Sequence, residues 1–307
     1  MSIDSSGTDR RHFLKCMTWA GTAAVWSVAG GIPRGRLIDS AEAATDGFHF
    51  VQISDSHLGF DKAANPHTTD TLKEALNGVM ALPQRPAFMI HTGDISHLSK
   101  PVQFDTGAQL MGATKLTVHT VPGEHDILAE NGKSYLNRFG KGSKGDGWYS
   151  FDAGGVHFIG LVNVVNQGDN GLGNLGHEQL EWLEDDTEHL SASTPIVVMA
   201  HIPLWIVYKD WGWGTADGAQ ALSYLKRFGS VTVLNGHIHQ VLQKVEGHVA
   251  FHTARSTAFP QPAPGAAKAP GPMAVPPGDL RHYLGIAKVS LVSSNAPLAI
   301  VDTPLAG

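Results

Sequence analysis

Cysteine is almost absent from this chain of 307 residues, since Cys16 is the only one. Cys16 lies in a segment that we expect to be removed, so the mature protein would have no disulfides and no thiolate metal ligands. Charged residues are also scarce, at 16%. No apolar run reaches the roughly 18–20 residues of a membrane span without a glycine or charge. We therefore expect a globular protein with no stable membrane anchor.

The N-terminus resembles a bacterial twin-arginine export signal. Arg10-Arg11 is followed by an apolar stretch, Trp19–Ile32, and by a small-x-small cleavage site, Ala41-Glu42-Ala43. We expect residues 1–43 to be removed during export by the twin-arginine translocase, which leaves a single domain at 44–307 in the periplasm or outside the cell. The alternative is an ordinary amphipathic helix with a chance arginine pair.

Acidic residues outnumber basic ones. The chain has 22 Lys and Arg against 28 Asp and Glu, and without residues 1–43 the counts are 17 and 24, a net charge of −7. Such a field opposes nucleic acid or an anionic membrane as a partner. A small anionic substrate stays compatible with it, because bound metal ions dominate the field inside a site.

The first half of the mature chain alternates apolar runs with segments of helical spacing. The expected strands are 48–53, 87–91 and 116–121, and the expected helices are 69–82 and 102–111. Leu72, Leu76, Val79 and Met80 would form the inner face of the first helix. This alternation predicts an α/β fold with parallel strands, whose sites lie at the carboxyl ends of the strands.

The second half is richer in strands. Helices are expected at 177–190, with an acidic face toward solvent, and at 218–228. The expected strands are 148–151, 156–162, 195–200 and 231–234, followed by 241–245, 248–253, 283–289 and 298–301 as a second, mostly antiparallel layer. The Pro-rich residues 260–279 are expected to be a loop.

Five short motifs place Asp, Glu or His where an apolar run ends and a loop begins. They are Asp55-Ser56-His57, Gly93-Asp94, Gly123-Glu124-His125-Asp126, His201-Ile202-Pro203 and Gly236-His237-Ile238-His239. Together they supply enough carboxylates and imidazoles for two transition-metal ions. Two metals in one site favour hydrolysis of phosphate esters, because they hold a hydroxide and polarise the phosphoryl group together.

The motifs, in this order and spacing, resemble those of the calcineurin-like metallophosphoesterases. Val51–Leu58, His91–Asp94 and Gly173–Leu183 are similar to the class III cyclic nucleotide phosphodiesterase branch. The resemblance covers about residues 48–290. It implies a four-layer α-β-β-α sandwich of two mixed sheets flanked by helices, with a dinuclear metal site at the carboxyl ends of the strands.

The resemblance also implies a role for the motif residues. Seven would be metal ligands: Asp55, His57 and His239 for the first metal, Glu124, His201 and His237 for the second, and Asp94 bridging both. A metal-bridging hydroxide would attack phosphorus in line. His125 would stabilise or protonate the leaving oxygen, and Asp126 would orient the His125 ring.

The third motif departs from the family, which has Asn where this chain has Glu124. An Asn amide is neutral and can donate to a phosphate oxygen, whereas an ionised Glu only accepts. With Asp55 and Asp94, Glu124 brings the carboxylate charge to −3 rather than −2. We expect it to select a more highly charged ion, such as Fe(III) beside a divalent Fe, Mn or Zn, or to narrow the substrates to less charged diesters. A tolerated replacement with the same role is the alternative.

Two more positions differ from known patterns. Ile202 stands where cyclic nucleotide enzymes often have a second His. His97 lies where purple acid phosphatases carry a metal-binding Tyr, and we expect an exposed loop histidine there, with contact to the first metal or the substrate as the alternative. The remaining strand histidines are expected to be structural: His49, His119, His157, His248 and His252.

Aromatic residues crowd the segment after His201. They are Trp205, Tyr208, Trp211 and Trp213. They are expected either to form a wall over a substrate group or to pack against the Pro-rich loop or an oligomer partner.

The sequence thus predicts an exported, dinuclear metal-dependent hydrolase of small phosphodiesters. One alternative is a phosphomonoesterase. Another is a metal-binding, weakly hydrolytic protein that binds a ligand, because Glu124 replaces the family Asn. A redox metalloprotein is a third.

Overall fold

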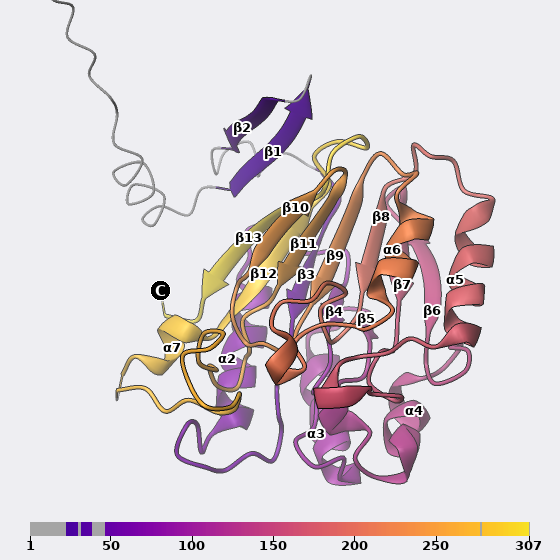
Figure 1. Ribbon diagram of the computed structural model, residues 1–307. Coiled ribbons are helices and arrows are strands. Elements are labelled where there is room, and N and C mark those ends of the chain that lie inside the picture. The colour runs from indigo at the N-terminus through magenta and orange to yellow at the C-terminus, as the bar shows by residue number, and fades with distance from the viewer. Residues whose placement is uncertain (1–22, 30–31, 39–46, 277, 307) are drawn as a thin grey trace, which may run out of the picture.

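The computed structural model describes residues 23–29, 32–38, 47–276 and 278–306 (Figure 1). The described parts of the predicted export segment are β1 (Ala23–Ala29) and β2 (Ile32–Ile38), which pair antiparallel. The arginine pair and the predicted cleavage site lie outside the described residues. Among the described residues, no helix has the length and apolar character needed to cross a membrane.

Two larger sheets make up the body of the protein. The strands of one are, in spatial order, β13 (Ala299–Pro304), β12 (Gly285–Ser290), β3 (His49–Ile53), β4 (Met89–His91) and β5 (Val118–Thr120). Those of the other are β10 (Gln243–Glu246), β11 (Val249–Thr253), β9 (Val231–Asn235), β8 (Ile196–Met199), β7 (Val156–Gly160) and β6 (Tyr149–Ala153).

Both sheets are mixed, as predicted. β3, β4 and β5 run parallel, and so do β7, β8, β9 and β11. The expectation of a separate antiparallel layer built from the last four strands is wrong. β10 and β11 extend the six-stranded sheet while β12 and β13 extend the other, because each parallel core offers unpaired backbone groups at its edge.

Helices cover the outer faces of both sheets, which gives the predicted four layers (Figure 1). α2 (Thr68–Met80) and α3 (Pro101–Ala113) pack on the five-stranded sheet, and α5 (His177–Glu188) and α6 (Gly218–Leu225) pack on the six-stranded one. The short helices α4 (Lys133–Phe139) and α7 (Leu280–Tyr283) were not predicted.

Alternation along the strands explains why the layers hold together. In β3, Val51 and Ile53 pack toward the α2 side, while Phe50 lies in the cluster between the sheets with Phe88 and Phe158. With both faces buried, the strands read as continuous apolar runs. On α2 the expected inner face is buried except at Met80. Met80 is 45% exposed, because it is the last residue of the helix and follows the buried Val79.

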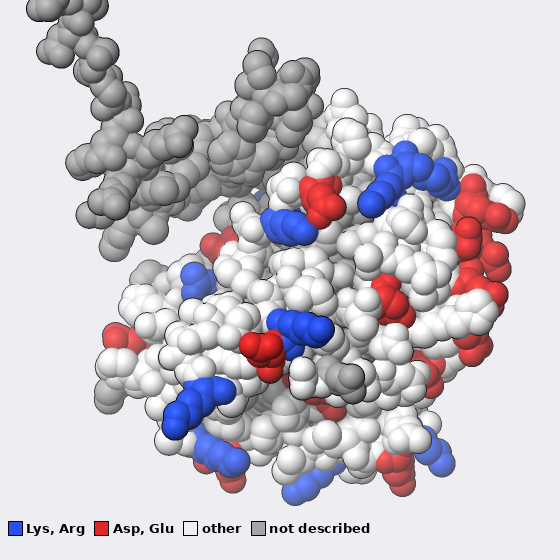
Figure 2. Space-filling model, viewed as in Figure 1, with Lys and Arg blue, Asp and Glu red and all other residues white. Residues whose placement is uncertain are grey.

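The surface predictions hold for two segments. The acidic side chains of α5 form a red band along one side of Figure 2, and Glu178, Glu181, Glu184 and Glu188 are exposed. The described part of 260–279 contains no helix or strand, as its prolines predict.

Candidate metal centre

All five motifs follow strands, as predicted, and they meet where the two sheets face each other. Asp55 and His57 follow β3, Asp94 follows β4 and Glu124 follows β5. From the other sheet, His201 follows β8, and His237 and His239 follow β9. The carboxyl ends of adjacent parallel strands therefore bring seven side chains together from positions up to 184 residues apart in the sequence.

Most of these residues have a backbone conformation that side chains other than glycine rarely adopt. Positive φ angles occur at five of the seven: Asp55 (53°), His57 (39°), Asp94 (56°), His237 (71°) and His239 (54°). Such conformations cost about 1–3 kcal/mol each and cluster at functional sites, where the surrounding structure enforces them.

One group of three donors contains Asp55, His57 and His239. His239 Nε2 lies 3.3 Å from Asp55 Oδ1 and 3.2 Å from His57 Nε2. Two imidazole nitrogens at this distance need either a shared proton or a cation between them. The group is the one predicted for the first metal.

A second group contains Glu124, His201 and His237. Glu124 lies 2.8 Å from His201 Nε2 through Oε2 and 3.0 Å from His237 Nδ1 through Oε1. Glu124 Oε2, His201 Nε2 and His237 Nδ1 are nevertheless buried without a hydrogen-bond partner. Lone pairs that converge in this way fit a bound cation, and the group is the one predicted for the second metal.

Asp94 lies between the two groups. Its Oδ2 atom is 3.5 Å from His57 Nε2 and 3.4 Å from His201 Nε2, while Oδ1 accepts a hydrogen bond from the backbone N–H of His125 at 2.9 Å. This position fits the predicted bridging role. The donor set of three carboxylates and four imidazoles suits two transition-metal ions.

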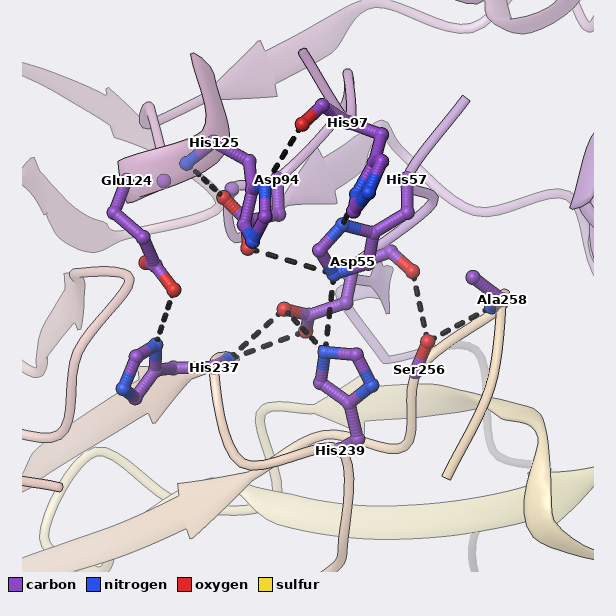
Figure 3. A network of polar contacts seen from close by, with 12 residues as sticks. Asp55, His57, Asp94, His97, Glu124, His125, His237, His239, Ser256 and Ala258 are labelled. Carbon is purple, nitrogen blue, oxygen red and sulfur yellow. Dashed lines mark hydrogen bonds and ion pairs between the residues drawn. The ribbon is translucent and has the colours of Figure 1, made fainter. Parts of the chain in front are cut away.

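Backbone carbonyls fix the orientation of two imidazoles. His201 Nδ1 donates to the Thr92 carbonyl at 2.6 Å, and His239 Nδ1 donates to the Phe259 carbonyl at 2.6 Å. In both rings Nε2 is therefore the atom left with a lone pair for a metal. Ser256 supports the loop that carries Asp55, because its hydroxyl donates to the Asp55 carbonyl (Figure 3).

Without a metal, the site is strongly biased toward holding positive charge. Burial would raise the pKa of Asp55, but His239 and His201 outweigh it and hold that pKa at about 2. Burial would lower the pKa of His201, but Asp94 and Glu124 outweigh it and raise that pKa well above the usual range. Metal ions would displace these protons, because only a neutral imidazole is a ligand.

Three motif glycines leave room for the cluster. A Cβ on Gly93 would lie 2.3 Å from His201 Nδ1, one on Gly123 would lie 2.1 Å from Asp94 Oδ1, and one on Gly236 would lie 2.6 Å from Asp55 Oδ2. Gly93 also has a φ of +101°. Any side chain at these positions would displace a predicted ligand.

The predicted contact between Asp126 and the His125 ring is wrong. The Asp126 carboxylate accepts hydrogen bonds from the backbone N–H groups of Ile95, Ser96 and Gly123 and from the Ser96 hydroxyl. The His125 ring is instead fixed by its Nδ1–H, which donates to the His97 carbonyl at 2.8 Å. The Asp126 carboxylate therefore links the loops that carry Asp94 and Glu124.

His97 lies at the site rather than on an exposed loop, so that expectation is wrong as well. Its Nδ1 is 3.3 Å from His57 Nδ1, and its ring stacks on the ring of His125 with centroids 4.7 Å apart. Burial and the nearby His125 lower its pKa to about 4. The sequence signal for this position is the spacing of three residues after Asp94.

A cavity of about 280 Å³ opens onto this cluster. Its lining includes His57, Asp94, Glu124 and His125 together with residues of the aromatic segment and of the Pro-rich loop. Trp211 and Trp213 line it, whereas Trp205 packs on Phe251 with ring centroids 4.9 Å apart. Gln261, another lining residue, was missed because nothing in its sequence context marks it.

The family model for calcineurin-like phosphoesterases matches residues 48–241. The chain belongs to this family. The match contains all seven predicted ligands as well as His125 and Asp126, whose roles in binding and catalysis stay predictions.

Curated relatives include phosphatases. The chain is 34% identical over 102 residues to purple acid phosphatase 23 and 30% identical over 138 residues to purple acid phosphatase 15, both from Arabidopsis thaliana. These matches cover 30% and 41% of this chain but only 21% and 25% of the plant proteins, so the chain spans about a quarter or less of their length. It is 24% identical over 213 residues to the serine/threonine-protein phosphatase CPPED1 of Pongo abelii, covering 59% of this chain and 67% of that one.

Solved structures share the fold. A dimetal phosphatase from Danio rerio has a TM-score of 0.63 at 18% identity, covering 80% of this chain and 93% of that one. A purple acid phosphatase from yellow lupin (Lupinus luteus) has a TM-score of 0.57 at 13% identity, covering 86% and 52%. At these identities the likeness concerns the fold alone, and the narrower resemblance to cyclic nucleotide phosphodiesterases stays a prediction.

Proposed function

We propose that the protein is a dinuclear metal-dependent phosphodiesterase. The observation that carries the proposal is the position of Asp94 Oδ2 between two groups of converging donors, 3.5 Å from His57 Nε2 and 3.4 Å from His201 Nε2. When bound, two metal ions would neutralise the phosphoryl oxygens and lower the pKa of a bound water. The membership in a phosphoesterase family supports this chemistry.

His125 is the proposed proton donor to the leaving group. Its ring lines the cavity beside the predicted ligands. Burial lowers its pKa, but Asp94 and Glu124 outweigh burial and raise that pKa while no metal ion shares their charge. Because Nδ1–H is held by the His97 carbonyl, Nε2 is the atom that exchanges the proton with the ester oxygen.

The charge of the site supports one of two alternatives, diesters as substrates or a trivalent ion in the pair. Asp55, Asp94 and Glu124 together carry −3 when ionised, which leaves +1 beside two divalent ions. With Asn the balance would be +2, and the weaker attraction at +1 costs a dianionic monoester about twice as much as a monoanionic diester. An Fe(III) ion with divalent Fe, Mn or Zn would restore the charge that a neutral Asn leaves in other family members.

The test combines metal content with paired substrates. The purified protein, loaded with Fe, Mn or Zn, is expected to hold two metals per chain and to have a kcat/KM for bis(p-nitrophenyl) phosphate about tenfold or more above that for p-nitrophenyl phosphate. Asp94→Asn should abolish both metal retention and turnover, while the exposed Asp105→Asn should change neither. Faster hydrolysis of the monoester would favour a phosphatase, as the names of the relatives suggest. Two metals without turnover of either ester would favour a metal-bound, ligand-binding protein.

Export by the twin-arginine translocase is a separate proposal, which rests on Arg10-Arg11 and the apolar stretch after it. Replacing Arg10 and Arg11 with Lys should retain the precursor in the cytoplasm. Cell fractionation and the mass of the mature protein test this, with a mature N-terminus near Ala44 as the expected result. An unprocessed protein in the cytoplasm of wild-type cells would contradict it.

A further inference from the structure

The cavity at the metal centre is lined by two kinds of residue, polar and apolar. The polar kind includes predicted ligands. Trp211 and the segment Pro270-Gly271-Pro272 form what we call the apolar wall. Phe259 also lines the cavity, but it stacks on His57 with ring centroids 4.7 Å apart. At about 280 Å³, the cavity suits a phosphoryl group and one ring system.

Trp211 is presented to the cavity by a rigid support. It ends a short 3-10 turn, Lys209–Trp211, that is closed by the backbone pairing of Tyr208 with Trp213. Its ring meets Tyr208 and Trp213 edge to face, with centroids 5.2 and 5.0 Å away. Trp213 is only 1% exposed, whereas Trp211 is half-buried. Trp213 therefore supports the wall, and Trp211 is the larger surface that a ligand can reach.

Hydrogen bonds connect the segment Pro270–Pro272 to the loop that carries His237. Gln261 accepts a hydrogen bond from the Gly271 N–H at 2.9 Å and donates one to the His237 carbonyl at 2.8 Å. Gln240 donates to the carbonyls of Gln261 and Pro262 at 3.2 and 2.7 Å. These bonds fix the position of the segment relative to His237, although Pro270 and Pro272 are exposed.

The described side chains that line the cavity do not offer a pair of cations to bind a second negative charge on a phosphate. Lys62 is the only lysine or arginine among the described residues that line it, and its side chain is exposed. Recognition of the organic part of a substrate therefore has to come from the apolar wall. Tryptophan and proline both offer flat apolar faces, which suit a planar ring better than a flexible chain.

We propose that Trp211 and the Pro270–Pro272 segment form a subsite for a planar ring carried by a monoanionic phosphate diester. This rests on the proposed phosphodiesterase function, because the ring is placed relative to a phosphoryl group at the metal centre. Trp211 determines specificity, and Gln261 positions the Pro270–Pro272 segment through its hydrogen bond to Gly271.

The test is binding of two monoanions that differ only in the ring, monomethyl phenylphosphonate and monomethyl methylphosphonate. Calorimetry on the metal-loaded protein is expected to show about tenfold tighter binding of the phenyl compound, in line with the energy of stacking on aromatic side chains. Trp211→Leu should reduce this preference to about threefold or less. The matched control is Trp205→Leu, which lies outside the cavity and should keep the preference.

Two outcomes would overturn the subsite: equal binding of both compounds to the wild type, or an unchanged preference in Trp211→Leu. If Trp211→Leu lowers the melting temperature sharply, the exposed pair Pro270→Ser and Pro272→Ser replaces it and should also reduce the preference. The binding readout separates this proposal from the function. A ring preference without hydrolysis of any ester refutes only the phosphodiesterase, and hydrolysis without a ring preference refutes only the subsite.

Discussion

Glu124 Oε2 lies 2.8 Å from His201 Nε2, yet neither atom has a hydrogen-bond partner. A carboxylate and an imidazole this close would normally form a charge-assisted hydrogen bond. Both residues belong, with His237, to a group of donors that lie within 4.8 Å of one another and could hold a metal ion. Glu124 is thus placed as a ligand would be, in the position where the family has a neutral Asn.

Glu124→Asn should change the metal preference of the protein. Removing one negative charge makes a pair of divalent ions sufficient, so we expect iron content to fall when Fe and Mn compete, and kcat/KM for a diester to rise about tenfold with Mn alone. Glu124→Gln is the matched control. It removes the same charge but keeps the length of the side chain, so it separates the effect of charge from that of length. Metal analysis and kinetics together measure this. If Glu124→Asn leaves both the metal content and the kinetics unchanged, the charge argument is wrong.

Gly236→Ala should disrupt the site, since its Cβ would lie 2.1 Å from Ser54 Oγ and 2.6 Å from Asp55 Oδ2. We expect loss of at least one metal per chain and a lower melting temperature. Gly112→Ala is the control, because its Cβ meets no atom within 4 Å and α3 gains a better helix former. That variant should be stabilised by about 0.5–1 kcal/mol. Full metal occupancy in Gly236→Ala would contradict the predicted role of Asp55.

Asp126→Asn separates a positioning role from a catalytic one. The carboxylate accepts four hydrogen bonds, and an Asn can accept at only one oxygen, so urea denaturation should show a loss of about 2–3 kcal/mol. Turnover should fall as Asp94 and Glu124 shift. The exposed Asp105→Asn should cost much less, because ion pairs at the surface contribute little to stability. A large loss of turnover at unchanged stability would instead mean that Asp126 acts directly on His125.

The motif positions at strand ends could be predicted because they depend only on local patterns, an apolar run followed by a polar turn. The contacts of Asp126 and His97 could not. Asp126 follows His125 directly, but the 3-10 turn Glu124–Asp126 carries its side chain toward the amides of Ile95 and Ser96, 30 residues away in sequence. The last four strands were assigned to the wrong layer for a related reason. β11 pairs with β9 and β12 pairs with β3, and no local pattern specifies these partners.

His157 offers a pH test of stability away from the metal centre. Its two ring nitrogens lie 2.9 Å from Asp152 Oδ1 and 2.9 Å from Asp186 Oδ2. Burial would lower its pKa, but Asp186 and Asp152 outweigh burial and raise it. A histidine whose folded pKa is raised binds its proton more tightly in the folded state. Its contribution to stability is therefore complete below the unfolded pKa of about 6.5 and is lost as pH rises through the folded value.

His157→Gln should accordingly lower the melting temperature most near pH 6, and the difference from the wild type should shrink toward pH 9. His119 is the control of opposite sign, because burial lowers its pKa to about 4 while its ring stacks on Phe151 with centroids 3.8 Å apart. The unfolded state binds the extra proton between pH 6.5 and 4, so His119 costs stability there, and His119→Gln should compare better with the wild type at pH 5 than at pH 8. Parallel shifts of both variants with pH would show that global charge, rather than these two environments, sets the pH dependence.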